Sequence, residues 1–139
     1  MKKQRVYLST IDPEAGSIAR AQGLGVEIAE YCTASNMDEH FEEHHQKVLA
    51  EVQGVPRRIL HGPFNELFPC AIDPKARRLA AQRYRQACGL AASYGADKVV
   101  IHAGFVPNVY YPCWYTEQSI LFWREFLKDM PENRIICLE

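Results

Sequence analysis

The chain has 139 residues, enough for one compact domain with a hydrophobic core. Hydrophobic residues make up 47% of it and charged residues 24%, as in ordinary globular proteins, and the formal net charge is −1. A charge so close to neutral gives no indication of a nucleic-acid or anionic-membrane partner. No apolar run approaches the roughly 20 residues that span a bilayer.

The number and spacing of the cysteines indicate the cellular compartment. The five cysteines are odd in number and contain no Cys-x-x-Cys pair: Cys32, Cys70, Cys88, Cys113 and Cys137. Scattered cysteines of this kind are typical of reduced thiols and argue against a disulfide framework or a zinc knuckle. We therefore expect a cytoplasmic protein.

Short apolar strands alternate with helical segments along the whole chain. Five runs have strand composition: 6–9, 26–29, 58–61, 98–102 and 134–139. Helices are expected between them: 12–23, from Asn36 or Asp38 to Gly54, 73–94 and about 116–128. Asp12-Pro13 and Asp73-Pro74 each place a capping residue before a proline, which predicts the first and third helix starts. The third helix carries apolar residues expected to form its buried stripe: Leu79, Ala80, Tyr84, Ala87, Leu90 and Ala91. The fourth helix carries Ile120, Leu121, Trp123 and Leu127.

This alternation predicts an α/β fold built from parallel βα units. Five strands in 139 residues scale to an eight-stranded barrel of about 250 residues. We expect residues 1–139 to be the amino-terminal part of a single (β/α) barrel of TIM type, incomplete, with about five strands and four helices of eight. A doubly wound sheet is the alternative, but no glycine-rich phosphate loop follows the first strand.

Three strands end in residues that bind metals. His61, His102 and Glu139 lie 41 and 37 residues apart (61 to 102 and 102 to 139), each close to one βα repeat. Because the carboxyl ends of barrel strands form the active-site face, these side chains are expected to converge. Two imidazoles and a carboxylate suit a divalent metal cofactor such as Zn²⁺, Mn²⁺ or Co²⁺, with Mg²⁺ left open.

Other histidines and charges have simpler interpretations. His40, Glu43 and His44 match the H-x-x-E-H zinc pattern, but the stretch is typical of a solvated helix face, and His45 is expected to pack with a hydrogen bond. Four arginines on the third helix are expected on the outer, solvated surface: Arg77, Arg78, Arg83 and Arg85. Glu27 is expected to point into the barrel and to need a polar partner.

Several motifs resemble the xylose-isomerase-like TIM-barrel superfamily, which joins sugar isomerases and epimerases to endonuclease IV-type apurinic-site nucleases. The matching segments are His61-Gly62-Pro63-Phe64, residues 94–104, Cys137-Leu138-Glu139 and residues 25–28. The resemblance implies that His61 and His102 occupy positions that bind metal in the nuclease branch. It implies that Glu139 is the strand-five glutamate that binds metal in both branches. The family's further ligands, on strands six to eight, would lie beyond Glu139.

The resemblance favours a divalent-metal-dependent sugar or sugar-phosphate isomerase/epimerase for the full-length protein, with the 139-residue chain alone expected to be inactive. Glu139 is the expected catalytic proton carrier. Phe64, Asn65, Phe105 and Trp114, in the loops after the third and fourth strands, are expected to bind the sugar, although loop packing is an equal alternative. An apurinic-site nuclease is less favoured, because residues 64–72 and 105–118 contain no Lys or Arg to contact DNA.

A third hypothesis is a non-catalytic half-barrel. An open sheet would leave two edge strands and interior residues such as Ile59, Val100, Ile135 and Cys137 uncovered. We therefore expect a homo-oligomer.

Overall fold

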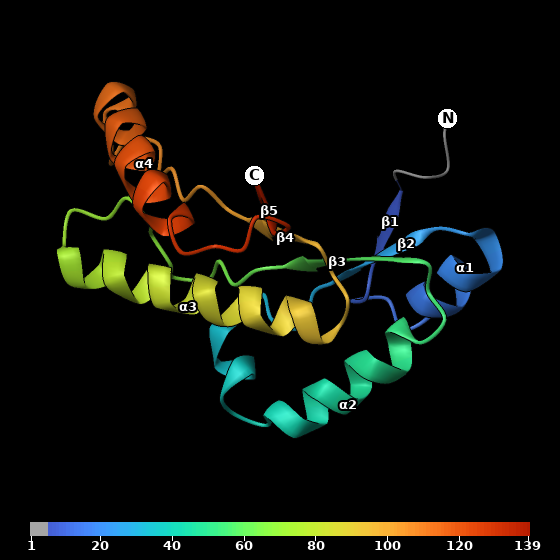
Figure 1. The fold of residues 1–139 in the computed structure, drawn as a ribbon. Coiled ribbons are helices and arrows are strands. Elements are labelled where there is room, and N and C mark those ends of the chain that lie inside the picture. Colours follow the sequence, from blue (N-terminus) through green and yellow to red (C-terminus); the bar gives the residue numbers. More distant parts are fainter. Residues whose placement is uncertain (1–5) are drawn as a thin grey trace.

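The protein folds as an open, fully parallel sheet with helices between successive strands (Figure 1). The structure is a computed structural model that describes residues 6–139. The strands are β1 (Tyr7–Ser9), β2 (Gly25–Ile28), β3 (Arg57–His61), β4 (Lys98–Ile101) and β5 (Ile135–Leu138). The helices are α1 (Ala15–Gln22), the 3₁₀ helix η2 (Ala34–Met37), α2 (Phe41–Val52), α3 (Pro74–Ser93) and α4 (Pro112–Leu127).

The strand order is β1-β2-β3-β4-β5, so each strand pairs with the next one in the sequence. In a doubly wound sheet, the order in which successive strands are added reverses at a switch point. Here each new strand is added on the same side. Across the described residues the sheet does not close on itself. The predicted fold class, an incomplete parallel barrel of TIM type, is therefore confirmed.

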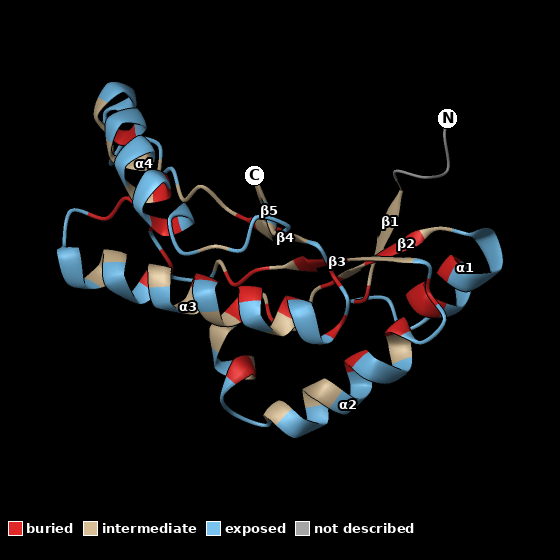
Figure 2. Ribbon diagram, viewed as in Figure 1, coloured by how far each residue is buried: buried red, intermediate tan, exposed pale blue. Residues whose placement is uncertain are grey.

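The two faces of the sheet differ in burial, and buried and intermediate residues follow each other along β3 (Figure 2). Paired residues of parallel strands share a face, and the register puts Val26, Leu60 and Val99 on the face that the helices cover, where they are fully buried. The opposite, inner face carries Glu27, Ile59, Val100, Ile135 and Cys137. Ile135 is 46% exposed there because no described element covers this face.

Glu27 lies on the inner face, as predicted. No described residue hydrogen-bonds its carboxylate, and the side chain is half-buried. The expected polar partner is therefore not found among residues 6–139. Because the inner face is open, water can solvate the carboxylate instead.

Helix starts were predicted with mixed success. Asp73 caps α3 as expected, since its carboxylate accepts a hydrogen bond from the Lys75 backbone N–H at 2.7 Å. The predicted cap at Asp12 is wrong: its carboxylate accepts from the N–H of Glu14 at 2.9 Å within a turn, and α1 begins only at Ala15. The same local turn chemistry that favours an N-cap can close a turn without starting a helix.

The second and fourth helices also start elsewhere than predicted. Asn36 belongs to η2, and α2 begins after His40. The left-handed backbone of His40, with a φ of 52°, separates the two helices. The fourth helix starts at Pro112, four residues earlier than expected, with the proline in its first turn. Leu79, predicted to lie in the buried stripe of α3, is instead 47% exposed.

Arginines hold the carboxyl ends of three helices at the amino-terminal end of the strands. Arg57 donates to the carbonyl of Gly23 at the end of α1, and Arg58 donates to that of Tyr94 at the end of α3. Arg20 donates to two carbonyls at the end of α2. Each guanidinium meets carbonyls left unpaired by the helix and the negative end of its dipole. Arg57, Arg20 and Arg58 therefore cap the carboxyl ends of α1, α2 and α3.

A chain of hydrogen bonds crosses the buried space between β2, α2 and α3. The hydroxyls of Tyr31 and Tyr94 lie 2.5 Å apart, and Nδ1 of His45 lies 2.7 Å from the Tyr94 hydroxyl. Phe41 stacks on the His45 ring at 5.3 Å. The predicted packing and hydrogen bonding of His45 are therefore confirmed.

No helix among residues 6–139 is long and apolar enough to cross a membrane. None of the five cysteines is paired in a disulfide.

Candidate metal centre

His61, His102 and Glu139 meet at the carboxyl ends of three adjacent strands. His61 is the last residue of β3, while His102 and Glu139 directly follow β4 and β5. Nε2 of His61 lies 3.3 Å from Nε2 of His102, and these two atoms lie 3.5 Å and 3.3 Å from Oε2 of Glu139. Among the described residues, this is the group of His, Cys, Asp and Glu side chains close enough to share an ion. The predicted convergence of the three side chains is confirmed.

The strand ladder holds Glu139 beside His102. The backbone N–H of Glu139 donates to the carbonyl of Ile101 at 3.0 Å, and the N–H of Ala103 donates to the carbonyl of Glu139 at 2.8 Å. The parallel pairing of β4 and β5 thus extends past both strands as they are defined. Because the backbone on both sides of His102 is paired with β5, the backbones of His102 and Glu139 are held side by side.

One hydrogen bond sets the tautomer of His61. Its Nδ1 lies 2.9 Å from the carbonyl oxygen of Gly62, which can only accept, so Nδ1 carries the proton. In the neutral imidazole, Nε2 of His61 is then the nitrogen with the free lone pair, and it lies next to Nε2 of His102 and Oε2 of Glu139. A backbone carbonyl on the second nitrogen is the usual arrangement for a metal-binding histidine.

The turn after β3 requires the glycine that follows His61. A Cβ on Gly62 would lie 3.0 Å from the carbonyl oxygen of Val100 and 3.3 Å from Cγ1 of Ile101. The Gly62 N–H donates to that same Val100 oxygen at 2.7 Å, so β3 and β4 approach closely here. Pro63 is fully buried and leads the chain into the loop that carries Phe64.

Phe64 contacts both imidazoles. Its ring stacks on His102, with centroids 4.2 Å apart and planes 10° from parallel. It meets His61 edge to face, with centroids 5.3 Å apart. The sequence placed Phe64 near the site but gave no sign of this contact.

A cavity of about 330 Å³ opens beside His102 and Glu139. Its lining is otherwise apolar: Phe64, Leu67, Phe68, Ala103, Gly104, Phe105 and Val106. Two of the four predicted substrate-binding residues, Phe64 and Phe105, are part of this wall. Asn65 lies outside it and donates to the Thr33 hydroxyl at 3.2 Å, and Trp114 packs against Tyr110 with centroids 5.5 Å apart.

The backbone of Cys32 contacts the loop that carries Phe64, since the Cys32 carbonyl accepts from the Phe64 N–H at 3.1 Å. Burial raises the pKa of the Cys32 thiol to about 11, and the carboxylates of Glu27 and Glu30 contribute to this rise. At neutral pH the side chain is therefore a protonated thiol. It is poorly suited to act as a nucleophile or a metal ligand.

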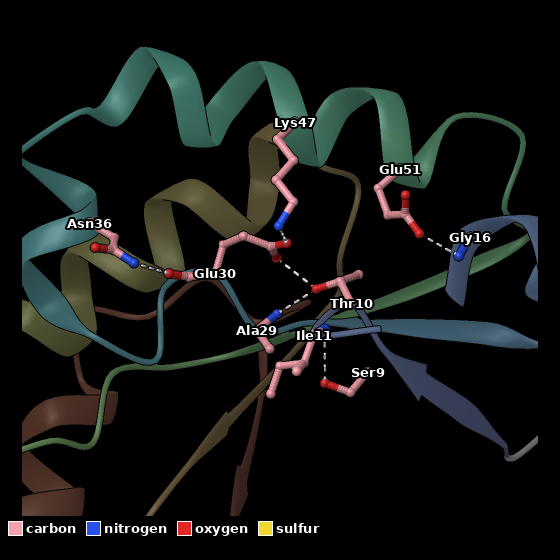
Figure 3. A network of polar contacts seen from close by, with 9 residues as sticks. All are labelled: Ser9, Thr10, Ile11, Gly16, Ala29, Glu30, Asn36, Lys47 and Glu51. Atoms are coloured by element: carbon pink, nitrogen blue, oxygen red, sulfur yellow. Dashed lines mark hydrogen bonds and ion pairs between the residues drawn. The ribbon is translucent and has the colours of Figure 1, made fainter. Parts of the chain in front are cut away.

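A buried carboxylate that the sequence analysis missed closes the ends of β1 and β2 (Figure 3). The hydroxyl of Thr10 donates to Glu30 at 2.6 Å and accepts from the Ala29 N–H at 2.9 Å, while Lys47 of α2 lies 3.3 Å from the Glu30 carboxylate. Only 5% of the Glu30 side chain is exposed. Its place just after a strand was the available signal, but its pairing with Lys47 indicates a structural role.

The H-x-x-E-H pattern forms no such centre. His40 is exposed and precedes α2 in a left-handed conformation, so it is not on the helix that carries His44. Two arginines of α3, which were predicted to be solvated, contact other residues. Arg83 pairs with Asp38 at 2.5 Å, and Arg85 lies over the Phe126 ring.

The fold and the site together define an incomplete TIM-type barrel with a His₂Glu cluster at the carboxyl ends of its strands. No protein-family model and no curated protein sequence matches this chain.

Two solved structures resemble it. A TTHB071 protein from Thermus thermophilus, from a crystal soaked with ZnCl₂, is 23% identical with a TM-score of 0.63, and the match covers 98% of this chain and 55% of that one. A D-tagatose 3-epimerase-like protein is 19% identical with a TM-score of 0.62, covering 81% of this chain and 42% of that one. The chain therefore spans about half the length of these two structures. At such identities the likeness shows the fold.

Proposed function

We propose that this chain supplies the first three metal ligands of a divalent-metal-dependent sugar isomerase or epimerase. The observation that carries the proposal is the set of separations between the three ligand atoms, 3.3, 3.3 and 3.5 Å, at the carboxyl ends of β3, β4 and β5. The D-tagatose 3-epimerase-like neighbour supports the reaction class. Because the chain spans about half of its neighbours, the activity is proposed for the whole protein.

The ligand types fit a divalent metal ion. Two imidazoles and a carboxylate suit Zn²⁺ or Co²⁺ better than Mg²⁺, which takes oxygen ligands. The separations of 3.3, 3.3 and 3.5 Å between the ligand atoms are short enough for one ion to bind all three. The ZnCl₂ soak of one neighbour agrees with this choice.

The chain's own residues have distinct tasks in this proposal. His61 and His102 hold the cation through Nε2, and Glu139 holds it through Oε2. A bound divalent cation supplies Lewis-acid polarisation of a substrate carbonyl or hydroxyl. The Glu139 side chain is 66% exposed, so its other carboxylate oxygen can accept a proton from a substrate carbon next to that carbonyl.

The apolar cavity beside the cluster favours an uncharged sugar. Its aromatic wall, Phe64, Phe68 and Phe105, can pack against the carbon face of a sugar ring or chain. No Lys or Arg lines the cavity within residues 6–139, and none occurs in residues 64–72 or 105–118. A phosphate group or a DNA backbone would therefore lack a cationic partner on this side of the site.

The test is sugar turnover by the whole protein, with D-tagatose among the free ketoses assayed. Activity should disappear on chelation and return when Zn²⁺, Mn²⁺ or Co²⁺ is added. Retention of activity in excess chelator, after metal removal has been verified, would overturn the proposal. Cleavage of abasic DNA faster than any sugar turnover would favour the nuclease instead.

A further inference from the structure

His61 and His102 are oriented by different means. The carbonyl of Gly62 fixes the ring of His61 through Nδ1. No described residue hydrogen-bonds Nδ1 of His102, and its side chain is 37% exposed. A second fixed group is therefore needed to hold the His102 imidazole, which otherwise rotates about two side-chain bonds.

The Phe64 ring occupies the place of that group. It lies flat on one face of the His102 imidazole at 4.2 Å, while its contact with His61 is edge to face at 5.3 Å. The two imidazoles themselves lie 5.0 Å apart at 66°. One phenyl ring thus touches both histidines and excludes water from one side of the pair.

The backbone holds Phe64 firmly enough to act in this way. Its N–H donates to the carbonyl of Cys32, in the loop after β2, at 3.1 Å, and its carbonyl accepts from the Leu67 N–H at 3.2 Å. The preceding residues, Gly62 and Pro63, are buried, and Gly62 lies against β4. Phe64 is therefore held by the loop after β2, and Gly62, two residues before it, is held by β4.

We infer that Phe64 is a positioning residue that preorganises the two histidines for metal binding. This inference rests on the proposed metal site. Holding the imidazoles in place before the ion arrives reduces the conformational entropy lost on binding, and residues that orient metal ligands typically contribute about 10- to 100-fold in affinity. The role differs from stacking on a sugar, because it acts when no substrate is present.

The experiment compares zinc affinity, measured by competition with a chromophoric chelator, for the unaltered chain, Phe64→Leu, Phe64→Ala and Phe64→Tyr. Phe68→Leu is the matched control, because Phe68 lines the same cavity but has no ring contact with either imidazole among the described residues. We expect Phe64→Leu and Phe64→Ala to weaken zinc binding by about tenfold or more. Phe64→Tyr, which keeps the aromatic face, and Phe68→Leu should stay within about threefold of the unaltered chain.

The visible absorption of bound Co²⁺ gives a second readout. Phe64→Leu should shift the bands as the imidazoles reorient, and Phe64→Tyr should restore them. A Phe64→Leu variant with native circular dichroism, unchanged zinc affinity and an unchanged Co²⁺ spectrum would overturn the inference and leave the metal site standing. Failure of the unaltered chain to bind zinc would overturn both.

Discussion

The hydroxyl of Tyr94 connects two otherwise separate polar groups in the core, and its removal should be costly. Tyr31 and Tyr94 are 0% and 2% exposed, and the Tyr94 hydroxyl bonds both the Tyr31 hydroxyl and Nδ1 of His45. Tyr94→Phe leaves the Tyr31 hydroxyl buried without its partner, which costs about 1–3 kcal/mol. His45 is half-buried, so water can replace its lost bond at a smaller cost. We expect a loss of about 2 kcal/mol in the free energy of unfolding.

A double-mutant cycle in urea isolates the interaction. Tyr31→Phe alone should cost about 1 kcal/mol, because the Tyr94 hydroxyl keeps its bond to His45. The double variant should cost about the same as Tyr94→Phe, which gives a coupling of about 1 kcal/mol. Tyr111→Phe is the control: this residue is 81% exposed and should change stability by less than about 0.5 kcal/mol. Additive losses, or a Tyr94→Phe variant as stable as the control, would refute the reasoning.

Three further outcomes are expected. Gly62→Ala should lower the free energy of unfolding, measured in urea, by about 1–3 kcal/mol and should weaken zinc binding, because the added Cβ would press on the Val100 carbonyl. Unchanged stability would contradict the close approach of β3 and β4. Burial raises the pKa of Cys32 and Cys88 from 9.0 to about 11, so the folded state holds these protons more tightly than the unfolded chain. Their contribution to stability is full below pH 9 and is lost as pH rises through 11, and a urea midpoint that stays level over this range would speak against it. The open inner face around Ile135 predicts self-association of the 139-residue chain, which sedimentation showing a stable folded monomer at micromolar concentration would rule out.

The sheet and the ligand cluster were predictable because both follow from a repeat. His61, His102 and Glu139 recur at strand ends at intervals of one βα unit, and parallel strands bring equivalent positions together whatever the loops do. The same logic does not extend to Glu30. Glu30 also follows a strand, β2, but its carboxylate pairs with Thr10 and Lys47. The sequence alone does not show in which direction the Glu30 side chain points.

Local signals were less informative than the repeat. Asp12-Pro13 and Asp73-Pro74 are the same dipeptide, yet one closes a turn and the other caps a long helix. Leu79 of α3 was expected to be buried but is 47% exposed, because a sequence shows which residues are apolar and not whether a neighbour covers them. The stacking of Phe64 on His102 depends on the path of a loop and on two side-chain rotations, which no residue pattern specifies.

Zinc binding by the chain itself tests the central claim most directly. Equilibrium dialysis should find one zinc ion per chain, with affinity reduced at least about tenfold in His61→Ala, His102→Ala and Glu139→Gln. His40→Ala, from the H-x-x-E-H segment, is the matched control and should bind as the unaltered chain does. Zinc binding that survives the loss of both His61 and His102, or that disappears in His40→Ala, would contradict the metal centre at the ends of β3, β4 and β5.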